Sequence, residues 1–259
     1  DRSFLQLSPF ASIITSCDPD HLDIYGDSSH FREGFEQYAA KIAQEGFCVQ
    51  KYGMNLVTNA KSISYGLNEP LADAIAKNLE FSNGTFFMNV SYLGKEYKSI
   101  ELGIPGVHNA ENALACFILC LELGLDERTI RAGLQTFKGV KRRFEYQIKS
   151  NDLVYIDDYA HHPTELKALI DSLRLLYPNR KITGVFQPHL FSRTRDFQDG
   201  FIEQLSRFDD TILMPIYPAR ELPIEGVSSE VILAELTNAS NRLLKADEVL
   251  AYFEKSSDE

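Results

Sequence analysis

The second half of the chain alternates between short apolar runs and stretches whose apolar residues recur at helical spacing. The apolar runs predict buried strands at 153–156, 182–186 and 211–216. The helically spaced stretches predict helices at 163–177, 195–208, 229–237 and near 246–254. Strands that alternate with helices in this way are typical of a parallel sheet flanked by helices.

The first half of the chain is less regular. A short buried strand is predicted at 10–15 and a helix around 31–42. Residues 47–104 hold short mixed runs with hairpin turns, which predict a small antiparallel sheet. The apolar stretch 113–123 predicts a buried helix, and Asp126 is placed to cap the helix that follows it.

A basic turn at 139–144 separates the less regular half from the alternating half. We therefore place a domain boundary there and predict two domains, 1–141 and 142–259. A length of 259 residues is enough for two ordinary domains. The predicted fold class is α/β, with a small antiparallel sheet in the first domain and a parallel sheet in the second.

Composition and charge exclude several classes of protein. The formal net charge is −11 and Lys and Arg form no long run, so we expect no nucleic-acid partner. No apolar run approaches the roughly 18 residues that a membrane span needs, so we expect no membrane partner. The four cysteines show no CxxC spacing, which suits a reducing compartment, and we predict a cytoplasmic protein.

Polar side chains crowd the ends of the three strands predicted in the second half, at 157–165, 187–196 and 217–221. In open α/β sheets ligands bind at the carboxyl ends of the strands, so three such clusters predict a binding edge. The cations of Arg193 and Arg195 would suit a carboxylate or a phosphate. The alternative is that these polar residues only cap helices, with Pro163 in the first turn of one, and are otherwise solvated.

Three further patterns bear on chemistry. His21 lies between Asp20 and Asp23, where it is either a surface residue or a metal ligand with partners from elsewhere in the chain. The adjacent His161 and His162 do not suit a shared zinc ion, because no further ligand motif accompanies them. The sequence contains neither a G-x-S-x-G nucleophile elbow nor a G-x-x-x-x-G-K-[ST] phosphate-binding loop.

Six motifs resemble those of the Mur ligase family and occur in the order of that family. They are Asp20–Asp23, Gly106–Ala113, Arg142–Phe144, Asp157–Glu165, Phe186–Asp196 and Tyr217–Gly226. The fourth and sixth motifs favour the branch that attaches L-alanine to UDP-N-acetylmuramate. The resemblance covers nearly the whole chain. It implies the remnant of a central ATPase-like α/β domain, followed by a Rossmann-like C-terminal α/β domain.

The resemblance implies an ATP-dependent ligase of peptidoglycan precursor synthesis. ATP would phosphorylate the carboxylate of UDP-N-acetylmuramate, and the amine of L-alanine would displace phosphate from the acyl phosphate. Mg²⁺ would accompany ATP, with His21 as a ligand. The residues implied in ATP binding are His108, Asn109, Asn112, Arg143 and Asp158. Those implied around alanine and the acyl phosphate are Tyr159 and three catalytic residues, His161, His189 and Arg193.

The chain departs from the family pattern in two respects. It lacks the UDP-binding portion and the phosphate-binding loop, so we expect the chain alone to be inactive. Leu190 stands where some members carry a basic residue. Two alternatives remain, a sister ligase that attaches a recycled tripeptide to UDP-N-acetylmuramate and a non-catalytic fragment that binds nucleotide or amino acid weakly. The 186–196 motif argues against the sister ligase. We expect a monomer or a homodimer.

Overall fold

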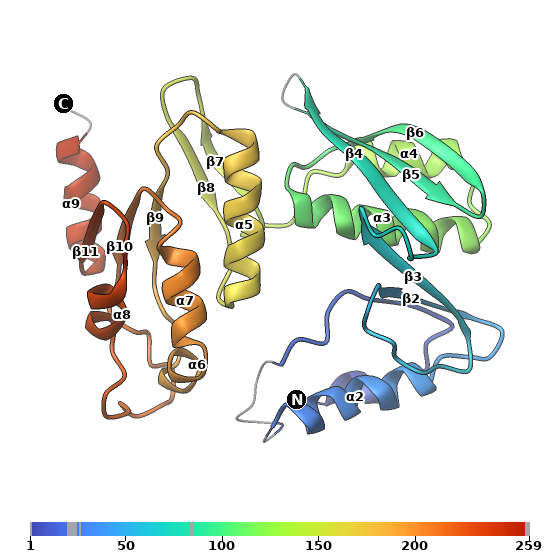
Figure 1. Cartoon of the computed structure of the whole chain (residues 1–259), viewed down its shortest axis with the longest axis horizontal. Coiled ribbons are helices and arrows are strands. Elements are labelled where there is room, and N and C mark those ends of the chain that lie inside the picture. The colour runs from blue at the N-terminus through green and yellow to red at the C-terminus, as the bar shows by residue number, and fades with distance from the viewer. Residues whose placement is uncertain (1, 20–24, 26, 83–84, 257–259) are drawn as a thin grey trace. The chain divides into compact units, whose positions relative to one another are not determined.

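The computed structural model describes residues 2–19, 25, 27–82 and 85–256. The chain forms two compact units, Asp1–Lys141 and Arg142–Glu259, called unit 1 and unit 2 below (Figure 1). Both units combine sheets with helices, so the predicted α/β class is confirmed. Within the described ranges, no helix has the length and apolar character that crossing a bilayer demands.

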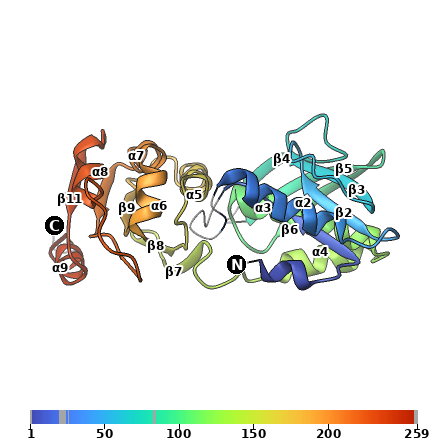
Figure 2. The same cartoon turned by 90° about the horizontal axis from the view of Figure 1, so that it is seen from below.

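Unit 1 is built on a six-stranded sheet in the order β1-β2-β3-β4-β5-β6 (Figures 1 and 2). The strands are β1 (Ala11–Ile14), β2 (Phe47–Lys51), β3 (Lys61–Leu67), β4 (Ala74–Ser82), β5 (Thr85–Tyr92) and β6 (Lys95–Leu102). The first four strands run parallel, whereas β5 is antiparallel to both β4 and β6.

The predicted antiparallel sheet is therefore right for β4 to β6 and wrong for β2 and β3. β2 buries three consecutive residues, as parallel strands covered on both faces do, while buried and half-buried residues alternate along β5. The short mixed runs of the sequence do not separate these cases, because strand direction depends on how the connections cross the sheet rather than on local pattern.

Helices cover the sheet of unit 1. They are the 3-10 turn η1 (Ser3–Gln6) and the α-helices α2 (Ser28–Ala40), α3 (Val107–Glu122) and α4 (Glu127–Thr136). α3 packs along β1 to β5, and Ala39 of α2 packs with Ile14 and Cys48 of the sheet. Asp126 caps α4 as predicted, since its carboxylate accepts a hydrogen bond of 3.0 Å from the Thr129 amide.

Unit 2 holds a three-stranded parallel sheet in the order β11-β10-β9. The strands are β9 (Thr183–Phe186), β10 (Asp210–Leu213) and β11 (Ser240–Leu243). A separate antiparallel hairpin is formed by β7 (Glu145–Lys149) and β8 (Val154–Asp157). The sequence placed the strand at 153–156 in the parallel sheet, and this is wrong for the described part of the chain because β8 pairs with β7. Polar and apolar residues alternate along β7, which is the signal for such a hairpin.

The helices of unit 2 are α5 (Pro163–Leu176), α6 (Phe191–Asp196), α7 (Gln198–Leu205), α8 (Ser229–Glu235) and α9 (Ala246–Ser256). The single helix predicted at 195–208 is therefore two helices that meet at Phe197. The backbone of Phe197 leaves the helical region, with φ −121°, and its ring packs edge-on against His162 with centroids 4.5 Å apart. α6 begins at Phe191, directly after the polar turn that follows β9.

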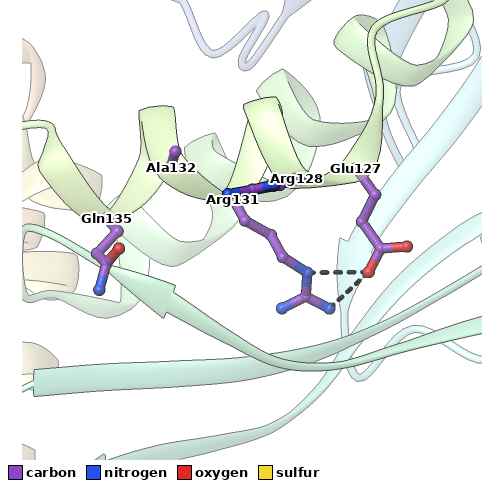
Figure 3. A pocket seen from close by; sticks show the side chains of 5 residues that line it. All are labelled: Glu127, Arg128, Arg131, Ala132 and Gln135. Atoms are coloured by element: carbon purple, nitrogen blue, oxygen red, sulfur yellow. Dashed lines mark hydrogen bonds and ion pairs between the residues drawn. The ribbon is translucent and has the colours of Figure 1, made fainter.

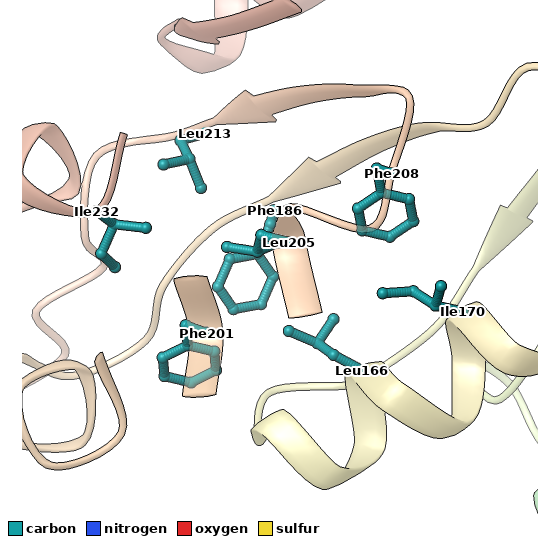
Figure 4. Close-up of a cluster of buried hydrophobic side chains, with 8 residues drawn as sticks. All are labelled: Leu166, Ile170, Phe186, Phe201, Leu205, Phe208, Leu213 and Ile232. Carbon is teal, nitrogen blue, oxygen red and sulfur yellow. The ribbon is translucent and has the colours of Figure 1, made fainter. Parts of the chain in front are cut away.

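One apolar cluster joins the helices of unit 2 to its sheet (Figure 4). Its buried members are Leu166, Ile170, Phe186, Phe201, Leu205, Phe208, Leu213 and Ile232. Gly184 is needed beside it, because a Cβ there would lie 2.4 Å from the Phe208 ring. Burial of each large apolar side chain stabilises the unit by roughly 1.5–3 kcal/mol, so this cluster fixes the strand ends and helix starts that carry the polar residues.

Candidate functional site

The turn between β8 and α5 carries the first predicted cluster. His162 caps α5, since its ring accepts a hydrogen bond of 3.3 Å from the Thr164 amide, and Pro163 begins the helix. Glu165 accepts a hydrogen bond of 2.9 Å from the His161 amide. Capping therefore explains His162 and Glu165, but it does not use the His161 ring.

The His161 ring is oriented by the backbone. Its Nδ1 lies 2.8 Å from the Tyr159 carbonyl oxygen and 3.4 Å from the Glu165 carboxylate, and the Tyr159 ring meets it edge-on at 5.1 Å. Because a carbonyl only accepts hydrogen bonds, Nδ1 is assigned the proton, and whenever the ring is neutral its lone pair lies on Nε2. An imidazole held in this tautomer can accept a proton at Nε2.

Asp158 links the start of unit 2 to this turn. Its carboxylate accepts hydrogen bonds from the amides of Phe144, at 2.7 Å, and Ala160, at 2.9 Å. The Tyr159 amide donates to the Arg142 carbonyl at 2.7 Å. Arg143, the other residue of unit 2 predicted to bind ATP, is exposed and lies between the two anchored neighbours. The structure therefore brings Asp158 and the 142–144 turn together.

The turn after β9 carries His189 and Arg193. The Leu190 amide donates to the Tyr217 carbonyl at 2.9 Å, and the Tyr217 amide donates to the Pro188 carbonyl at 2.8 Å. His189 and Tyr217 thus form a parallel bridge beyond β9 and β10, and their rings stack with centroids 5.4 Å apart. Arg193 is 8% exposed, although it carries a charge. A guanidinium is rarely buried to this degree unless partners face it.

The charges of these two turns influence each other. Loss of hydration together with the Arg193 and His161 charges lowers the pKa of His189, and Glu221 opposes them. The rings of His162 and Phe197 meet with centroids 4.5 Å apart, so the turn before α5 lies beside the end of α6. His161, His189 and Arg193 therefore form one candidate site within unit 2. The lowered pKa keeps His189 neutral at neutral pH, so the site combines a buried cation, which suits an anion, with imidazoles that accept protons.

Unit 1 carries its own group at the start of α3. Asn109 is buried, and its side-chain amide donates to the Pro105 carbonyl at 2.6 Å, so it braces the loop before the helix. Gly106 has φ +114° at the N-cap, and a Cβ there would come within 3.1 Å of the His108 ring. Asn112 is exposed on the same helix. The three residues predicted to contact adenine therefore share one helix end.

The predicted metal ligand, His21, lies outside the described residues. Within the described part, no three or more His, Cys, Asp and Glu side chains cluster in a way that could hold a metal ion. A surface hollow along α4 contains none of the predicted site residues (Figure 3). The Arg131 side chain that lines the hollow donates hydrogen bonds to Glu127, at 2.9 Å, and to backbone carbonyls of β6. Contacts within unit 1 therefore occupy this cation.

Three residues without a predicted role contact the candidate site residues of unit 2. Glu165 holds the His161 backbone, and Ser192 and Glu221 are hydrogen-bonded to each other beside Arg193. All three lie inside motifs that the sequence singled out. Spacing alone could not identify Glu221, because its partner Ser192 lies 29 positions away in the chain.

Comparison with known proteins places both units in one family. A family model for the Mur ligase middle domain matches residues 2–120, and one for the Mur ligase glutamate ligase domain matches residues 142–257. A curated relative, the UDP-N-acetylmuramate–L-alanine ligase of Christiangramia forsetii, is 45% identical over 95% of this chain and 53% of its own length. The chain spans about half the length of the curated relatives it matches.

Solved structures agree with this assignment. The UDP-N-acetylmuramate–alanine ligase of Thermotoga maritima has a TM-score of 0.76 at 26% identity, over 95% of this chain and 53% of that one. A MurF ligase from Thermotoga maritima, solved in complex with ADP, shares the fold with a TM-score of 0.68 at 16% identity, over 98% of this chain and 64% of that one. The chain belongs to the Mur ligase family and carries its middle and C-terminal domains.

Proposed function

We propose that the protein containing this chain joins L-alanine to UDP-N-acetylmuramate with ATP, in the cytoplasmic stage of peptidoglycan precursor synthesis. The observation that carries the proposal is that two neighbouring turns of unit 2 present the buried cation of Arg193, which suits an anion, together with the oriented rings of His161 and His189, which suit proton transfer. The curated relatives that bear the name of this reaction support the choice of amino acid.

The proposed chemistry explains why these residue types are needed. A carboxylate is a poor electrophile, so the γ-phosphoryl group of ATP is transferred to a carboxylate oxygen, which gives an acyl phosphate and ADP. The amine nitrogen of alanine then attacks the acyl carbon, phosphate leaves, and the amine loses a proton. The Arg193 guanidinium suits the negative charge on the acyl phosphate or on the alanine carboxylate. The neutral His189 ring, or the Nε2 atom of His161, suits the proton.

Nucleotide-binding residues are proposed for each unit separately. In unit 2, Asp158 would accept hydrogen bonds from the ribose hydroxyls and Arg143 would lie near the phosphates. In unit 1, His108, Asn109 and Asn112 would contact adenine. The ADP complex of the related MurF ligase supports nucleotide use by this family. Mg²⁺ remains a proposal that accompanies ATP, since the implied ligand His21 lies outside the described residues.

The choice of amino acid is tested with the full-length protein that contains this chain. We expect phosphate release from ATP only when UDP-N-acetylmuramate and an amino acid are both present, with L-alanine preferred over glycine and serine. The isolated 259-residue chain should not ligate, because it lacks the phosphate-binding loop. Preference for a murein tripeptide would replace the proposal with the sister ligase.

Asp158 and His161 should affect different substrates, although they lie three positions apart. Asp158→Ala removes a charged acceptor from the proposed ribose contact, so the KM for ATP should rise about ten- to a hundredfold. It also removes the acceptor of the Phe144 and Ala160 amides, so the melting temperature should fall. His161→Ala should instead raise the KM for alanine and lower kcat.

Steady-state kinetics with each substrate varied, beside a thermal melt of each variant, separates these effects. Asp152→Ala is the matched control, because Asp152 is exposed on the β7–β8 hairpin of the same unit. If both site variants lowered the melting temperature and left the two KM values unchanged, Asp158 and His161 would be structural residues only.

A further inference from the structure

Helix α6 presents Arg193 but has no capping side chain of its own. Its N-cap residue is Leu190, which offers no side-chain acceptor and has φ +69°, in the left-handed region that apolar residues rarely occupy. A non-glycine residue keeps such a conformation only when its surroundings over-determine it. The contacts that hold Leu190, and those that satisfy the backbone amides at the start of α6, therefore deserve a functional explanation.

Glu221, from the loop after β10, takes the place of the missing cap. One carboxylate oxygen accepts a hydrogen bond of 2.9 Å from the Ser192 amide, and the other accepts one from the Ser192 hydroxyl. Partial burial raises the pKa of Glu221, but the hydrogen bonds from Ser192 and Phe191 and the Arg193 charge outweigh it, so the pKa lies below its usual range. Glu221 is therefore ionised at neutral pH, which suits the amides at a helix start.

The same loop holds the other side of the turn. Tyr217 pairs with Pro188 and Leu190 through two backbone hydrogen bonds and stacks on the His189 ring. Tyr217 thus fixes His189, while Glu221 fixes the residue before Arg193. Leu190, the strained residue, is itself held by Tyr217 and lies two positions before Ser192, which Glu221 holds.

We propose that Ser192 and Glu221 are positioning residues, which clamp the turn 189–193 so that His189 and Arg193 face the substrate. The inference rests on the proposed ligase function. Neither residue needs to touch substrate. Loss of the carboxylate leaves the Ser192 amide and hydroxyl without their acceptor and removes one of the two attachments of the Leu190 turn. A displacement of about 1 Å at a catalytic group lowers a rate about a hundredfold.

The test compares Glu221→Gln with Glu225→Gln, because Glu225 is an exposed carboxylate in the same loop. In the full-length protein, Glu221→Gln should lower kcat/KM for the amino acid about ten- to a hundredfold. The KM for ATP and the melting temperature should stay close to those of the parent. Ser192→Ala should give a smaller loss in the same parameter, Ser192→Thr should restore it because it keeps the hydroxyl, and Glu225→Gln should match the parent.

A second readout does not require ligation. Nuclear magnetic resonance of the 259-residue chain reports the Ser192 amide and the titration of His189. Glu221→Gln should shift that amide and lower the pKa of His189, because the carboxylate that favours the protonated ring is lost. Glu225→Gln should change neither.

Kinetics and magnetic resonance together separate a failure of the proposed ligase function from a failure of the proposed positioning role of Glu221. If the full-length parent does not ligate, the proposed function fails, and resonance alone decides whether Glu221 clamps the turn. If the parent ligates and Glu221→Gln retains its kcat/KM, the positioning role is overturned. An equal loss in Glu225→Gln, or a loss that only follows unfolding in the thermal melt, overturns it as well.

Discussion

Arg193→Ala in the full-length protein is expected to lower kcat/KM for the amino acid about a hundredfold or more, the largest effect of any single polar change in unit 2. Hydrogen bonds to a charged group contribute about 1.5–3 kcal/mol each, and a guanidinium can make two to one carboxylate or phosphate. Two such bonds correspond to a factor of at least about a hundred in the rate constant.

Burial of Arg193 strengthens this expectation. The residue is 8% exposed, so its charge acts through a region from which water is largely excluded. An anion that develops beside it is stabilised more than it would be at the surface. Arg193→Lys keeps the charge but not the planar pair of donors, so we expect it to recover only part of the lost activity.

Arg195→Ala is the matched control. Arg195 lies on the same helix, two positions away, with a side chain 55% exposed and an ion pair of 2.7 Å to its neighbour Asp196. Such an exposed pair contributes little, so activity should change less than about twofold. Steady-state kinetics with alanine varied measures kcat/KM for the Arg193 and Arg195 variants. Similar losses in both variants would mean that general positive charge, rather than the buried guanidinium, serves the site.

This pair of arginines shows what the sequence could and could not predict. Both follow the strand at 182–186 and both would suit an anion, so the local pattern gives them equal weight. The resemblance singles out Arg193, and packing gives the physical difference between the two. Both lie on α6, where residues two positions apart face different sides of the helix, so Arg193 is buried and Arg195 is exposed. The helix predicted from the sequence began at 195, so the sequence did not place both arginines on one helix and could not show which of them is buried.

Strand pairing between distant segments of the chain was also beyond what the sequence could predict. The sequence located β8, β9 and β10 within a residue or two at most ends, because apolar runs and turns mark strands locally. It did not predict that β8 pairs with β7, since pairing depends on residues that are distant in sequence. Asp158 shows the same limit, because its two backbone partners include Phe144, which lies 14 positions earlier. A motif can therefore indicate where chemistry lies without showing which of its residues brace the site.

Phe201→Ala is expected to lower the free energy of unfolding of unit 2 by about 3–5 kcal/mol. Phe201 is 1% exposed on α7, and its ring lies 5.4 Å from that of Phe186 on β9. Its removal opens a cavity in the cluster that joins the helices to the sheet (Figure 4). Because a domain is typically stable by only about 5–15 kcal/mol, this single change removes a large share.

Unfolding in urea is monitored by hydrogen exchange, which mass spectrometry detects in peptides from residues 142–256. This method suits a chain without tryptophan, which offers no strong fluorescent reporter. Phe253→Ala is the control, since Phe253 lies on α9 and is 43% exposed, and its loss should cost about 1 kcal/mol or less. A similar cost for the two variants would contradict the packing described here. The strand ends and helix starts that hold His161, His189 and Arg193 would then depend on other contacts.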